Sequence, residues 1–345
     1  MFNNLKNKAY FFVDRIERLY FSKKDIAEGY FLCGENKAYF TDARYFSDAV
    51  KYFRNTDITP YLFNGLESIK EYLVKQNVLE VITDFDKISV SLYNYLSSFL
   101  KVTDGSDKLT HAREIKTDKE LSFIKKACSI VQKAYYSAIK ELKLGMTEIE
   151  LKDILEDYML KYGADDIGFE TIVAFGKGSA VPHHVTGKTK LKENTPVLID
   201  AGAKYKGYIS DITRVAFFGT PSKKFVKIYN AVLGANLLAE EQIYSGLSTK
   251  EADKLARDYL KREGLDKYFT HSLGHGVGLE VHEAPTLSKK TNTLLKNGCV
   301  FTIEPGVYLD NQFGVRIEDT VVLEKGKIKR LFSDNKKLLI IKDKS

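Results

Sequence analysis

The sequence VLIDAG at residues 197–202, followed by YISDITRV at residues 208–215, is the part of this chain that decides its fold. Both stretches are apolar runs typical of strands, and a turn around residues 205–206 would join them into a hairpin. Paired residues in a hairpin have a constant index sum, so this turn places Asp200 opposite Asp211. We therefore expect the Cβ atoms of the two aspartates to lie about 5 Å apart.

Two carboxylates at this separation repel each other strongly. One of them must take up a proton unless a positive charge lies between them. A divalent metal ion would supply that charge, so the hairpin predicts a metal site at Asp200 and Asp211.

A second hairpin repeats the arrangement further along the chain. The sequence CVFTIE at residues 299–304 is a strand that enters a Pro-Gly turn, and GVRIEDTVV at residues 314–322 is the returning strand. Glu304 and Glu318 are equally distant in sequence from Asn311, which lies at the centre of the connection. The same reasoning predicts that these two glutamates face each other.

His275 completes the set of candidate metal ligands. It lies in LGHGVG at residues 273–278, between glycines that allow another backbone to approach closely. Two Asp, two Glu and one His suit Mn²⁺, Co²⁺, Zn²⁺ or Fe²⁺. Four carboxylates balance two divalent ions, which favours a dinuclear centre in which the ions share a water molecule and polarise a carbonyl group. Each position alone is more often a strand end or turn residue, so the prediction rests on their joint occurrence.

The first 110 residues have the pattern of an α/β domain. Strands are expected at residues 29–33, 38–41 and 78–83, and helices at residues 66–74 and 90–100. The turn-rich sequence TDGSD at residues 103–107 indicates a boundary. We therefore divide the chain into domains 1–112 and 113–345.

The rest of the chain contains two predicted helix pairs. The first pair begins at Thr117 or Asp118, runs to Gly145, and continues in a second helix with a capping box at Thr147. The second pair covers residues 222–244 and 248–263. Strand-rich blocks follow each pair, so we expect an internally duplicated α+β domain with helices on one face of curved sheets.

Composition excludes several classes of protein. The 345 residues are 44% hydrophobic and 29% charged, which excludes a disordered or low-complexity chain. No stretch approaches the roughly 20 apolar residues of a membrane helix, and the N-terminus has no secretory signal. The three cysteines Cys33, Cys128 and Cys299 are far apart and have no metal-binding spacing. They are typical of buried free thiols in a reducing compartment, so we expect a cytoplasmic protein without membrane contact.

The net charge of +7 does not indicate a nucleic-acid partner. Residues 324–345 contain eight basic and three acidic residues, so this C-terminal stretch carries most of the excess. No finger, RNP or helix-turn-helix signature accompanies it. We therefore expect no nucleic acid among the partners.

The same residues carry a resemblance to a known family. The chain resembles the pita-bread metallopeptidases, specifically the Xaa-Pro aminopeptidase and Xaa-Pro dipeptidase (prolidase) branch. The matching stretches are IDAG (199–202), SDITR (210–214), HSLGHGVG (271–278), VHE (281–283), TIEPG (302–306) and VRIED (315–319). A weaker match, FTDARY at residues 40–45, resembles the creatinase-like N-terminal domain. The implied fold class is α+β, with an N-terminal creatinase-like α/β domain before a C-terminal pita-bread (creatinase/aminopeptidase) catalytic domain.

The resemblance implies a role for each site residue. The ligands of two divalent ions, most often Mn²⁺, would be Asp200, Asp211, His275, Glu304 and Glu318, with Asp211 and Glu318 shared between the ions. A metal-bridging hydroxide would attack the peptide carbonyl. Glu304, together with His183 and His282, would handle protons. His271, His282 and Arg316 would lie at the substrate.

One departure bears on the choice of substrate. Some prolidases carry Arg in a His-Glu-x-Pro-Arg stretch, where it binds the carboxylate of a dipeptide, but here the last position is Thr286. We therefore favour an aminopeptidase P-like exopeptidase that acts on short peptides with proline at the second position. The alternatives are an Xaa-Pro dipeptidase and a non-catalytic peptide- or protein-binding member of the fold. By analogy with the family, a homodimer is expected.

Overall fold

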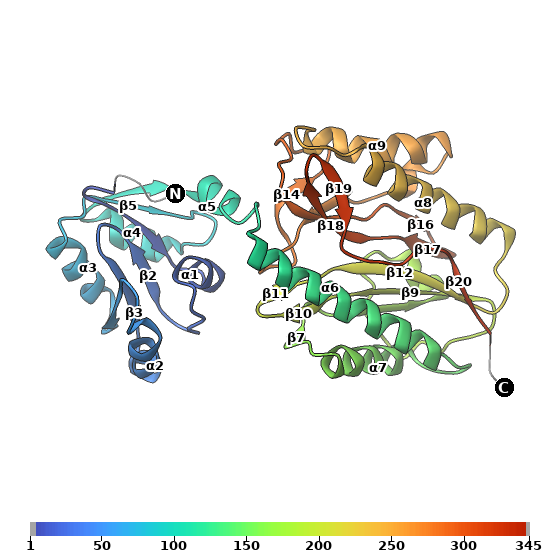
Figure 1. Ribbon diagram of the computed structural model, residues 1–345, viewed down its shortest axis with the longest axis horizontal. Coiled ribbons are helices and arrows are strands. Elements are labelled where there is room, and N and C mark those ends of the chain that lie inside the picture. The colour runs from blue at the N-terminus through green and yellow to red at the C-terminus, as the bar shows by residue number, and fades with distance from the viewer. Residues whose placement is uncertain (1–4, 343–345) are drawn as a thin grey trace. The chain divides into compact units, whose positions relative to one another are not determined.

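The computed structural model describes residues 5–342 of the chain. It consists of two compact units, Met1–Arg113 and Glu114–Ser345. Figure 1 shows the first unit in blue to cyan and the second in green to red. None of the helices in residues 5–342 is long and apolar enough to cross a membrane.

The first unit is built on one mixed six-stranded sheet with the strand order β4-β3-β2-β1-β5-β6. Its strands are β1 (Lys8–Phe12), β2 (Tyr30–Cys33), β3 (Lys37–Thr41), β4 (Ile58–Leu62), β5 (Glu80–Thr83) and β6 (Lys101–Asp104). Its helices are α1 (Arg15–Ser22), α2 (Ala43–Phe53), α3 (Leu66–Lys75), α4 (Val90–Ser97) and α5 (Ser106–His111). The strands and helices predicted for this part are present within a few residues.

The sequence analysis did not predict the remaining elements of this unit, which are β1, β4, β6, α1, α2 and α5. Helices α1 and α2 begin at aspartate caps, Asp14 and Asp42, whose carboxylates accept backbone N–H groups of the first turn. Apolar residues at helical spacing follow both caps, such as Ile16 and Leu19 in α1 and Ala49 and Phe53 in α2, but the helix predictions did not use them. Strand β1 was missed although it is central in the sheet, because its sequence was considered only as a possible signal segment.

The second unit contains four long helices, as predicted. They are α6 (Asp118–Ala138), α7 (Glu148–Lys161), α8 (Lys223–Gln242) and α9 (Thr249–Arg262). Capping boxes begin α6, α7 and α9. The prediction that the first helix runs to Gly145 was wrong. It ends at Ala138 and continues as a 3-10 turn, Ile139–Glu141, after which Leu142 is no longer helical (ψ 130°) and is buried.

Strands of the second unit form four hydrogen-bonded sheets with the orders β11-β10-β7, β20-β12-β9-β8, β14-β13-β15-β18-β19 and β16-β17. The strands before the middle of the unit are β7 (Asp166–Ile167), β8 (Ile172–Phe175), β9 (Thr195–Ala201), β10 (Ala203–Tyr205), β11 (Tyr208–Ile209) and β12 (Ile212–Phe218). The later strands are β13 (Gly274–Gly276), β14 (Glu283–Leu287), β15 (Val300–Ile303), β16 (Gly306–Leu309), β17 (Phe313–Arg316), β18 (Asp319–Glu324), β19 (Lys327–Arg330) and β20 (Leu339–Ile341).

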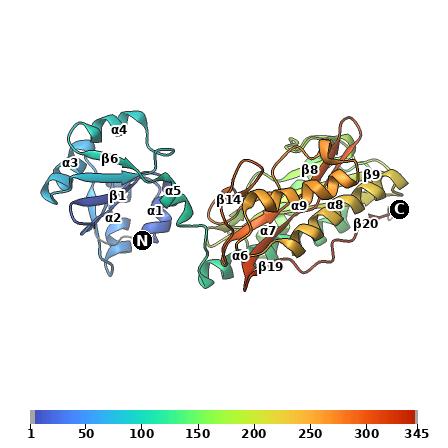
Figure 2. The same ribbon diagram turned by 90° about the horizontal axis from the view of Figure 1, so that it is seen from above.

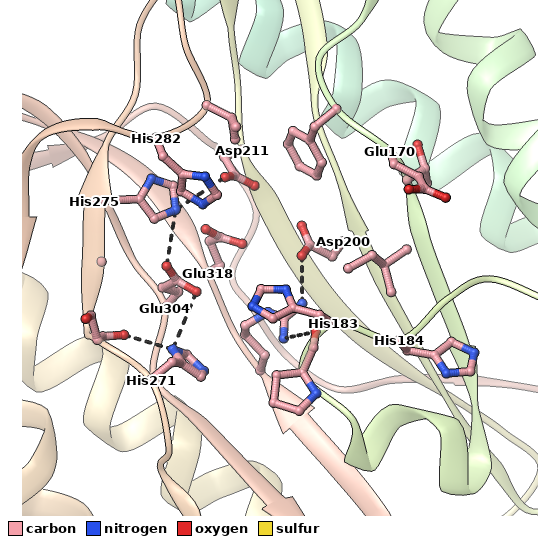
Figure 3. Close-up of a pocket in the computed structure, with 18 of the residues that line it drawn as sticks. Glu170, His183, His184, Asp200, Asp211, His271, His275, His282, Glu304 and Glu318 are labelled. Carbon is pink, nitrogen blue, oxygen red and sulfur yellow. Dashed lines mark hydrogen bonds and ion pairs between the residues drawn. The ribbon is translucent and has the colours of Figure 1, made fainter. Parts of the chain in front are cut away.

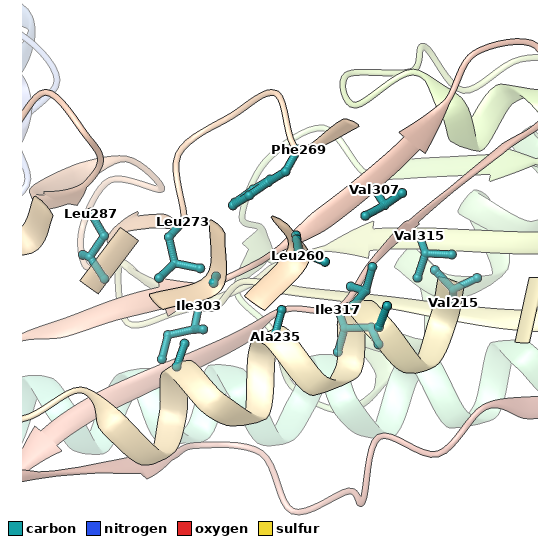
Figure 4. Packing of buried hydrophobic residues seen from close by; sticks show 14 of the residues in the cluster. Val215, Ala235, Leu260, Phe269, Leu273, Leu287, Ile303, Val307, Val315 and Ile317 are labelled. Atoms are coloured by element: carbon teal, nitrogen blue, oxygen red, sulfur yellow. The ribbon is translucent and has the colours of Figure 1, made fainter. Parts of the chain in front are cut away.

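Each helix pair packs on its own hydrophobic core. One core joins α8 and α9 to β15 and β17, and Figure 4 shows its side chains. The other joins α6 and α7 to β8 and β9. Figure 1 shows the strands running between the two helix pairs, and Figure 2 shows α8 and α9 side by side. This repetition of a helix pair with its sheet agrees with the predicted duplication.

The predicted register of the first hairpin was wrong by two residues, because the turn is centred one residue later than expected. Asp200 pairs with Thr213, not with Asp211. The reason is the turn, which lies at Lys206 and Gly207, both with positive φ (52° and 84°). Such two-residue turns need a left-handed backbone at both positions, which favours glycine at the second. Asp211 therefore lies two positions along from the partner of Asp200.

The predicted register of the second hairpin is confirmed. Ile303 pairs with Asp319, and Gly306 pairs with Arg316, as the expected index sum requires. The prediction did not foresee that these pairs belong to two different sheets. Glu304 and Glu318 lie between them, at the point where one ladder ends and the next begins.

Candidate metal centre

A pocket of about 550 Å³ lies in the second unit. Its walls come from β8, β9, β13, β14 and β17, from the loop around residue 183, and from residues directly before or after these strands. Figure 3 shows this pocket with the side chains of Asp200, Asp211, His275, Glu304 and Glu318 pointing into it. All nine residues that the sequence singled out for the site line it: His183, Asp200, Asp211, His271, His275, His282, Glu304, Arg316 and Glu318.

Three of these residues form a compact set of donor atoms. One oxygen or nitrogen atom each of Asp211, His275 and Glu318 lies within 4.8 Å of the other two. The Nε2 atom of His275 is 3.7 Å from Asp211 Oδ2 and 3.3 Å from Glu304 Oε1. Figure 3 shows these side chains converging on one space, with Asp200 facing them from across the pocket.

His275 can reach this space because of its neighbouring glycines. A Cβ atom on Gly274 would lie 2.0 Å from the carbonyl oxygen of Thr302, and one on Gly276 would lie 2.1 Å from that of Ala284. Strand β13 therefore packs directly against β15 and β14, and the imidazole of His275 extends into the pocket. The close backbone approach predicted from the sequence is confirmed.

Asp200 is held by a buried arginine. Arg316 Nη2 donates to Asp200 Oδ2 over 2.6 Å, Nη1 donates to Tyr308 Oη over 2.8 Å, and Nε donates to Thr213 Oγ1 over 2.9 Å. The Arg316 side chain is 4% exposed. Its contacts in this structure are therefore with the walls of the site, which orients Asp200.

Sequence reasoning missed three residues that support the site. Thr213 Oγ1 donates to Glu318 Oε2 over 2.6 Å, and Thr302 Oγ1 accepts from the backbone N–H of His275 over 3.1 Å. Tyr308 Oη lies 2.8 Å from His271 Nε2. Thr213 and Thr302 lie two residues from Asp211 and Glu304, so strand alternation could have indicated them. Nothing in the sequence pattern pointed to Tyr308.

Burial and mutual repulsion set the protonation of the carboxylates. Burial, together with the charge of Glu318, raises the pKa of Asp211 well above its usual value, and burial with Glu304 does the same for Glu318. The pKa of Glu304 moves the other way. Burial alone would raise it, but the hydrogen bond to His275 and the charge of His271 lower it to about 2.

These residues fit a divalent cation. Asp200 Oδ1 and Asp211 Oδ1 are buried side-chain oxygens without a hydrogen-bond partner among residues 5–342. Buried polar atoms are normally paired, and an orphaned carboxylate oxygen is costly. Positive charge between the carboxylates would supply the missing partners and relieve the repulsion that helps raise the pKa of Asp211. Oxygen atoms with one imidazole nitrogen form a donor set suited to Mn²⁺, Fe²⁺, Co²⁺ or Zn²⁺.

The remaining histidines surround this centre. His271 lies beneath it, with Nδ1 3.8 Å from Glu304 Oε2. His282 packs edge-on against His275, with ring centroids 4.3 Å apart, and like His183 it is exposed toward the pocket. Burial lowers the pKa of His271, and burial together with His275 lowers that of His282. Neutral imidazoles can both accept and donate protons.

His184 has a different environment. Its Nε2 atom lies 3.0 Å from Glu148 Oε2, and the same fully buried carboxylate accepts backbone N–H groups of Phe175 and Gly187. Sequence analysis gave His184 no part in catalysis. Its contacts tie the loop that carries His183 to the start of α7.

Thr286 also lines the pocket, directly opposite His275 in the pairing of β13 with β14. Its side chain is exposed. Among the residues that line the pocket, all within the described range, Arg316 is the one arginine or lysine. Thr286 itself supplies no positive charge for a substrate carboxylate.

Comparison with known proteins places this geometry in a family. The model of metallopeptidase family M24 matches residues 122–325. The Xaa-Pro dipeptidase of Pyrococcus furiosus is 40% identical over 277 residues, which is 80% of each chain.

Two solved structures are similar over nearly the whole chain. An Xaa-Pro dipeptidase from Bacillus anthracis has a TM-score of 0.91 and 34% identity, and an X-Pro aminopeptidase from Thermotoga maritima has a TM-score of 0.90 and 32% identity. Each match covers 96% of this chain and 95% of the other. The predicted resemblance and fold class are confirmed. The chain is a pita-bread metallopeptidase with an N-terminal α/β domain, and it belongs to metallopeptidase family M24.

Proposed function

We propose that this metallopeptidase is an Xaa-Pro dipeptidase, which hydrolyses the bond between a first residue and proline. The observation that carries the proposal is the convergence of Asp211, His275 and Glu318 in a pocket walled by histidines. The choice of dipeptidase is supported by the relative from Pyrococcus furiosus and the structure from Bacillus anthracis, both named Xaa-Pro dipeptidase. The Xaa-Pro dipeptidase activity therefore replaces the aminopeptidase P-like activity as our first candidate.

We assign the metal ligands as the sequence suggested: Asp200, Asp211, His275, Glu304 and Glu318. When bound, two divalent ions would lower the pKa of a water molecule and polarise the peptide carbonyl. Mn²⁺ is our first choice, because the set is dominated by carboxylate oxygens. The catalytic centre then lies wholly within the unit Glu114–Ser345.

Residues of the chain would handle the protons. Glu304 lies on the pocket wall beside His275 and accepts a proton from the attacking water. His282 and His183 are exposed at the pocket, where either can protonate the leaving proline nitrogen. His271 is held by Tyr308 and by the carbonyl oxygen of Ser272, so it is the most firmly positioned of the three.

A second candidate is an aminopeptidase that cleaves longer peptides with proline at the second position. Thr286 favours this second candidate. Because Thr286 carries no positive charge, this side of the pocket does not require the substrate to end in the free carboxylate of its proline. The structure from Thermotoga maritima named X-Pro aminopeptidase is equally similar in fold. Both candidates share the same metal centre and differ in the length of peptide that they accept.

A peptide panel distinguishes the candidates. The protein is stripped with a chelator, restored with Mn²⁺, and incubated with Ala-Pro, Ala-Pro-Ala and Met-Ala-Ser, and the products are followed by mass. We expect metal-dependent cleavage of Ala-Pro with little cleavage of the two tripeptides. Preferential cleavage of Ala-Pro-Ala would instead identify an aminopeptidase. No cleavage of any peptide by a metal-loaded protein would contradict both and favour a binding protein.

The ligand assignment has its own control. Glu318→Gln should abolish cleavage and reduce the metal content, whereas Glu324→Gln should change neither. Both residues belong to the same returning strand segment, but Glu324 is paired with Lys329 at the surface. Full activity in Glu318→Gln would show that the ligand assignment is wrong.

A further inference from the structure

The two glutamates of the metal centre lie where their strands stop pairing with each other. The ladder of β15 and β18 ends at Ile303 and Asp319, and the ladder of β16 and β17 resumes at Gly306 and Arg316. Between these pairs the backbone N–H of Glu304 donates to Leu273 O over 2.8 Å.

The backbone of Glu318 likewise forms its hydrogen bond outside this pair of strands. The backbone N–H of Glu318 donates to Thr213 O over 3.1 Å, and a 3.3 Å hydrogen bond from Ile317 N to Pro305 O spans the gap. The regular ladder therefore does not fix the separation of the two carboxylates. Beyond this backbone hydrogen bond, a side chain of α8 also links the two strands here.

Asn236 of α8 spans this gap. Its Nδ2 atom donates to Ile303 O over 2.9 Å and to Ile317 O over 3.2 Å. These carbonyl groups belong to the residues that directly precede Glu304 and Glu318. Asn236 is fully buried, and Figure 4 shows its neighbour Ala235 on the side of α8 that faces Ile303 and Ile317. A single side-chain amide thus forms hydrogen bonds with both strands, one residue before each glutamate.

Lys336 determines which way this amide points. Its Nζ atom donates to Asn236 Oδ1, and it also lies 2.9 Å from Asp319 Oδ2 and 2.9 Å from Glu240 Oε2. An ammonium group has donors and no acceptor, so the amide oxygen must face Lys336 and the NH₂ group must face the strands. Because Lys336 is 2% exposed and ion-paired, the amide has one stable orientation.

We propose that Asn236 is a positioning residue that sets the separation of Glu304 and Glu318, and that Lys336 holds it in the orientation this requires. The inference rests on the proposed assignment of both glutamates as metal ligands. Residues behind metal ligands contribute 10- to 100-fold to metal affinity in other proteins. We expect an effect of that size here, through geometry alone, because Asn236 carries no charge and touches neither carboxylate in the hydrogen bonds of this structure.

Two substitutions of similar volume test the inference. Asn236→Leu removes both donors without adding charge, and Asn236→Asp removes the donors but keeps an oxygen for Lys336. Each variant is compared with the wild type by calorimetric titration of the full metal-free chain with Mn²⁺, and by the visible absorption spectrum after loading with Co²⁺. We expect a Kd for Mn²⁺ that is roughly 10- to 100-fold weaker, and an altered Co²⁺ spectrum.

Tyr229→Phe is the matched control. Tyr229 also belongs to α8, is buried, and donates a hydrogen bond to the backbone of Lys336 over 3.0 Å. Its loss costs about as much stability as the loss of one amide hydrogen bond, but the hydrogen bond of its hydroxyl goes to Lys336 and not to the strands that carry the glutamates. The control should bind Mn²⁺ with the affinity and spectrum of the wild type.

Each other outcome overturns the inference. If both Asn236 variants bind Mn²⁺ like the wild type, Asn236 does not position the ligands, although the ligand assignment stands. If Tyr229→Phe weakens binding as much, the effect is a general loss of core stability. If the wild type itself binds no Mn²⁺, the ligand assignment is wrong, and this inference fails with it.

Discussion

Arg316 and Asp200 form a 2.6 Å ion pair inside the candidate metal centre, so one carboxylate faces both an arginine and the space that the metal ions would occupy. The opposite oxygen, Asp200 Oδ1, has no hydrogen-bond partner among residues 5–342. Arg316 therefore binds one oxygen of this carboxylate, Oδ2, and the other oxygen, Oδ1, remains available to bind a cation. The stability of the metal-free protein should depend on this arginine.

We predict that Arg316→Met destabilises the metal-free protein more than the Mn²⁺-loaded protein. Removing one partner of a buried ion pair costs about 3–5 kcal/mol, and bound metal ions would offset part of that cost by compensating Asp200. Chemical denaturation with and without Mn²⁺ measures both values. Lys329→Met, which removes an exposed pair with Glu324, should cost less than about 1 kcal/mol in either state. Equal destabilisation by Arg316→Met in both states would show that Asp200 does not bind metal.

His282 should matter for turnover and not for metal binding. We predict that His282→Asn lowers kcat about 100-fold, because a proton donor to the leaving nitrogen contributes at least that much. Its metal content should equal that of the wild type, since His282 contacts the centre through the ring of His275. His111→Asn, in the first unit, is the control and should leave kcat unchanged. A loss of metal in His282→Asn would make this residue a ligand.

Thr286 should control the length of the peptide. It lies opposite His275 on the neighbouring strand and lines the pocket. We predict that Thr286→Arg lowers KM for Ala-Pro and raises it for Ala-Pro-Ala, because a guanidinium group there would bind a carboxylate that directly follows proline. Thr286→Lys supplies the charge without the paired donors and should have a smaller effect. An unchanged ratio of the two KM values would mean that the substrate carboxylate lies elsewhere.

The first unit should lose stability as the pH rises. Glu17 is buried, and burial with the charges of Asp84 and Asp14 raises its pKa from 4.5 to about 8. The folded state therefore keeps a proton that the unfolded state releases above pH 4.5. The contribution of Glu17 is fully present below that pH and is lost as the pH rises through about 8.

Glu17→Gln removes this dependence. Calorimetry should show that the variant is more stable than the wild type at pH 8.5, by about 2–4 kcal/mol, and similar to it at pH 4.5. Glu71→Gln, an exposed position in the same unit, should show no such difference. A wild type whose stability does not fall between pH 5 and pH 8.5 relative to Glu17→Gln would contradict the buried, protonated state of Glu17.

Much of the site could be predicted from the sequence because its residues follow local rules. Strand registers and glycine spacing brought Glu304, Glu318 and His275 to the correct place. The predicted pairing of Asp200 was wrong because the position of the turn determines it. The sequence pattern did not show that Lys206 would adopt a left-handed backbone and place the turn one residue later. Both aspartates still line the pocket, because Asp211 lies two residues from Thr213, the partner of Asp200, and residues two apart lie on the same face of a strand.

The supporting contacts could not be predicted in this way. Tyr308 contacts Arg316 and His271, and Asn236 contacts Ile303 and Ile317, across distances of 8 to 81 residues in sequence. Such contacts depend on how helices and sheets pack, and no local pattern encodes them.

Anomalous diffraction from crystals of the Mn²⁺-loaded protein tests the central claim most directly. The account predicts two manganese peaks in the pocket, with Asp211 and Glu318 contacting both ions and Asp200, His275 and Glu304 completing the centre. Manganese bound elsewhere, or a single ion that does not contact Asp211 and Glu318, would contradict it.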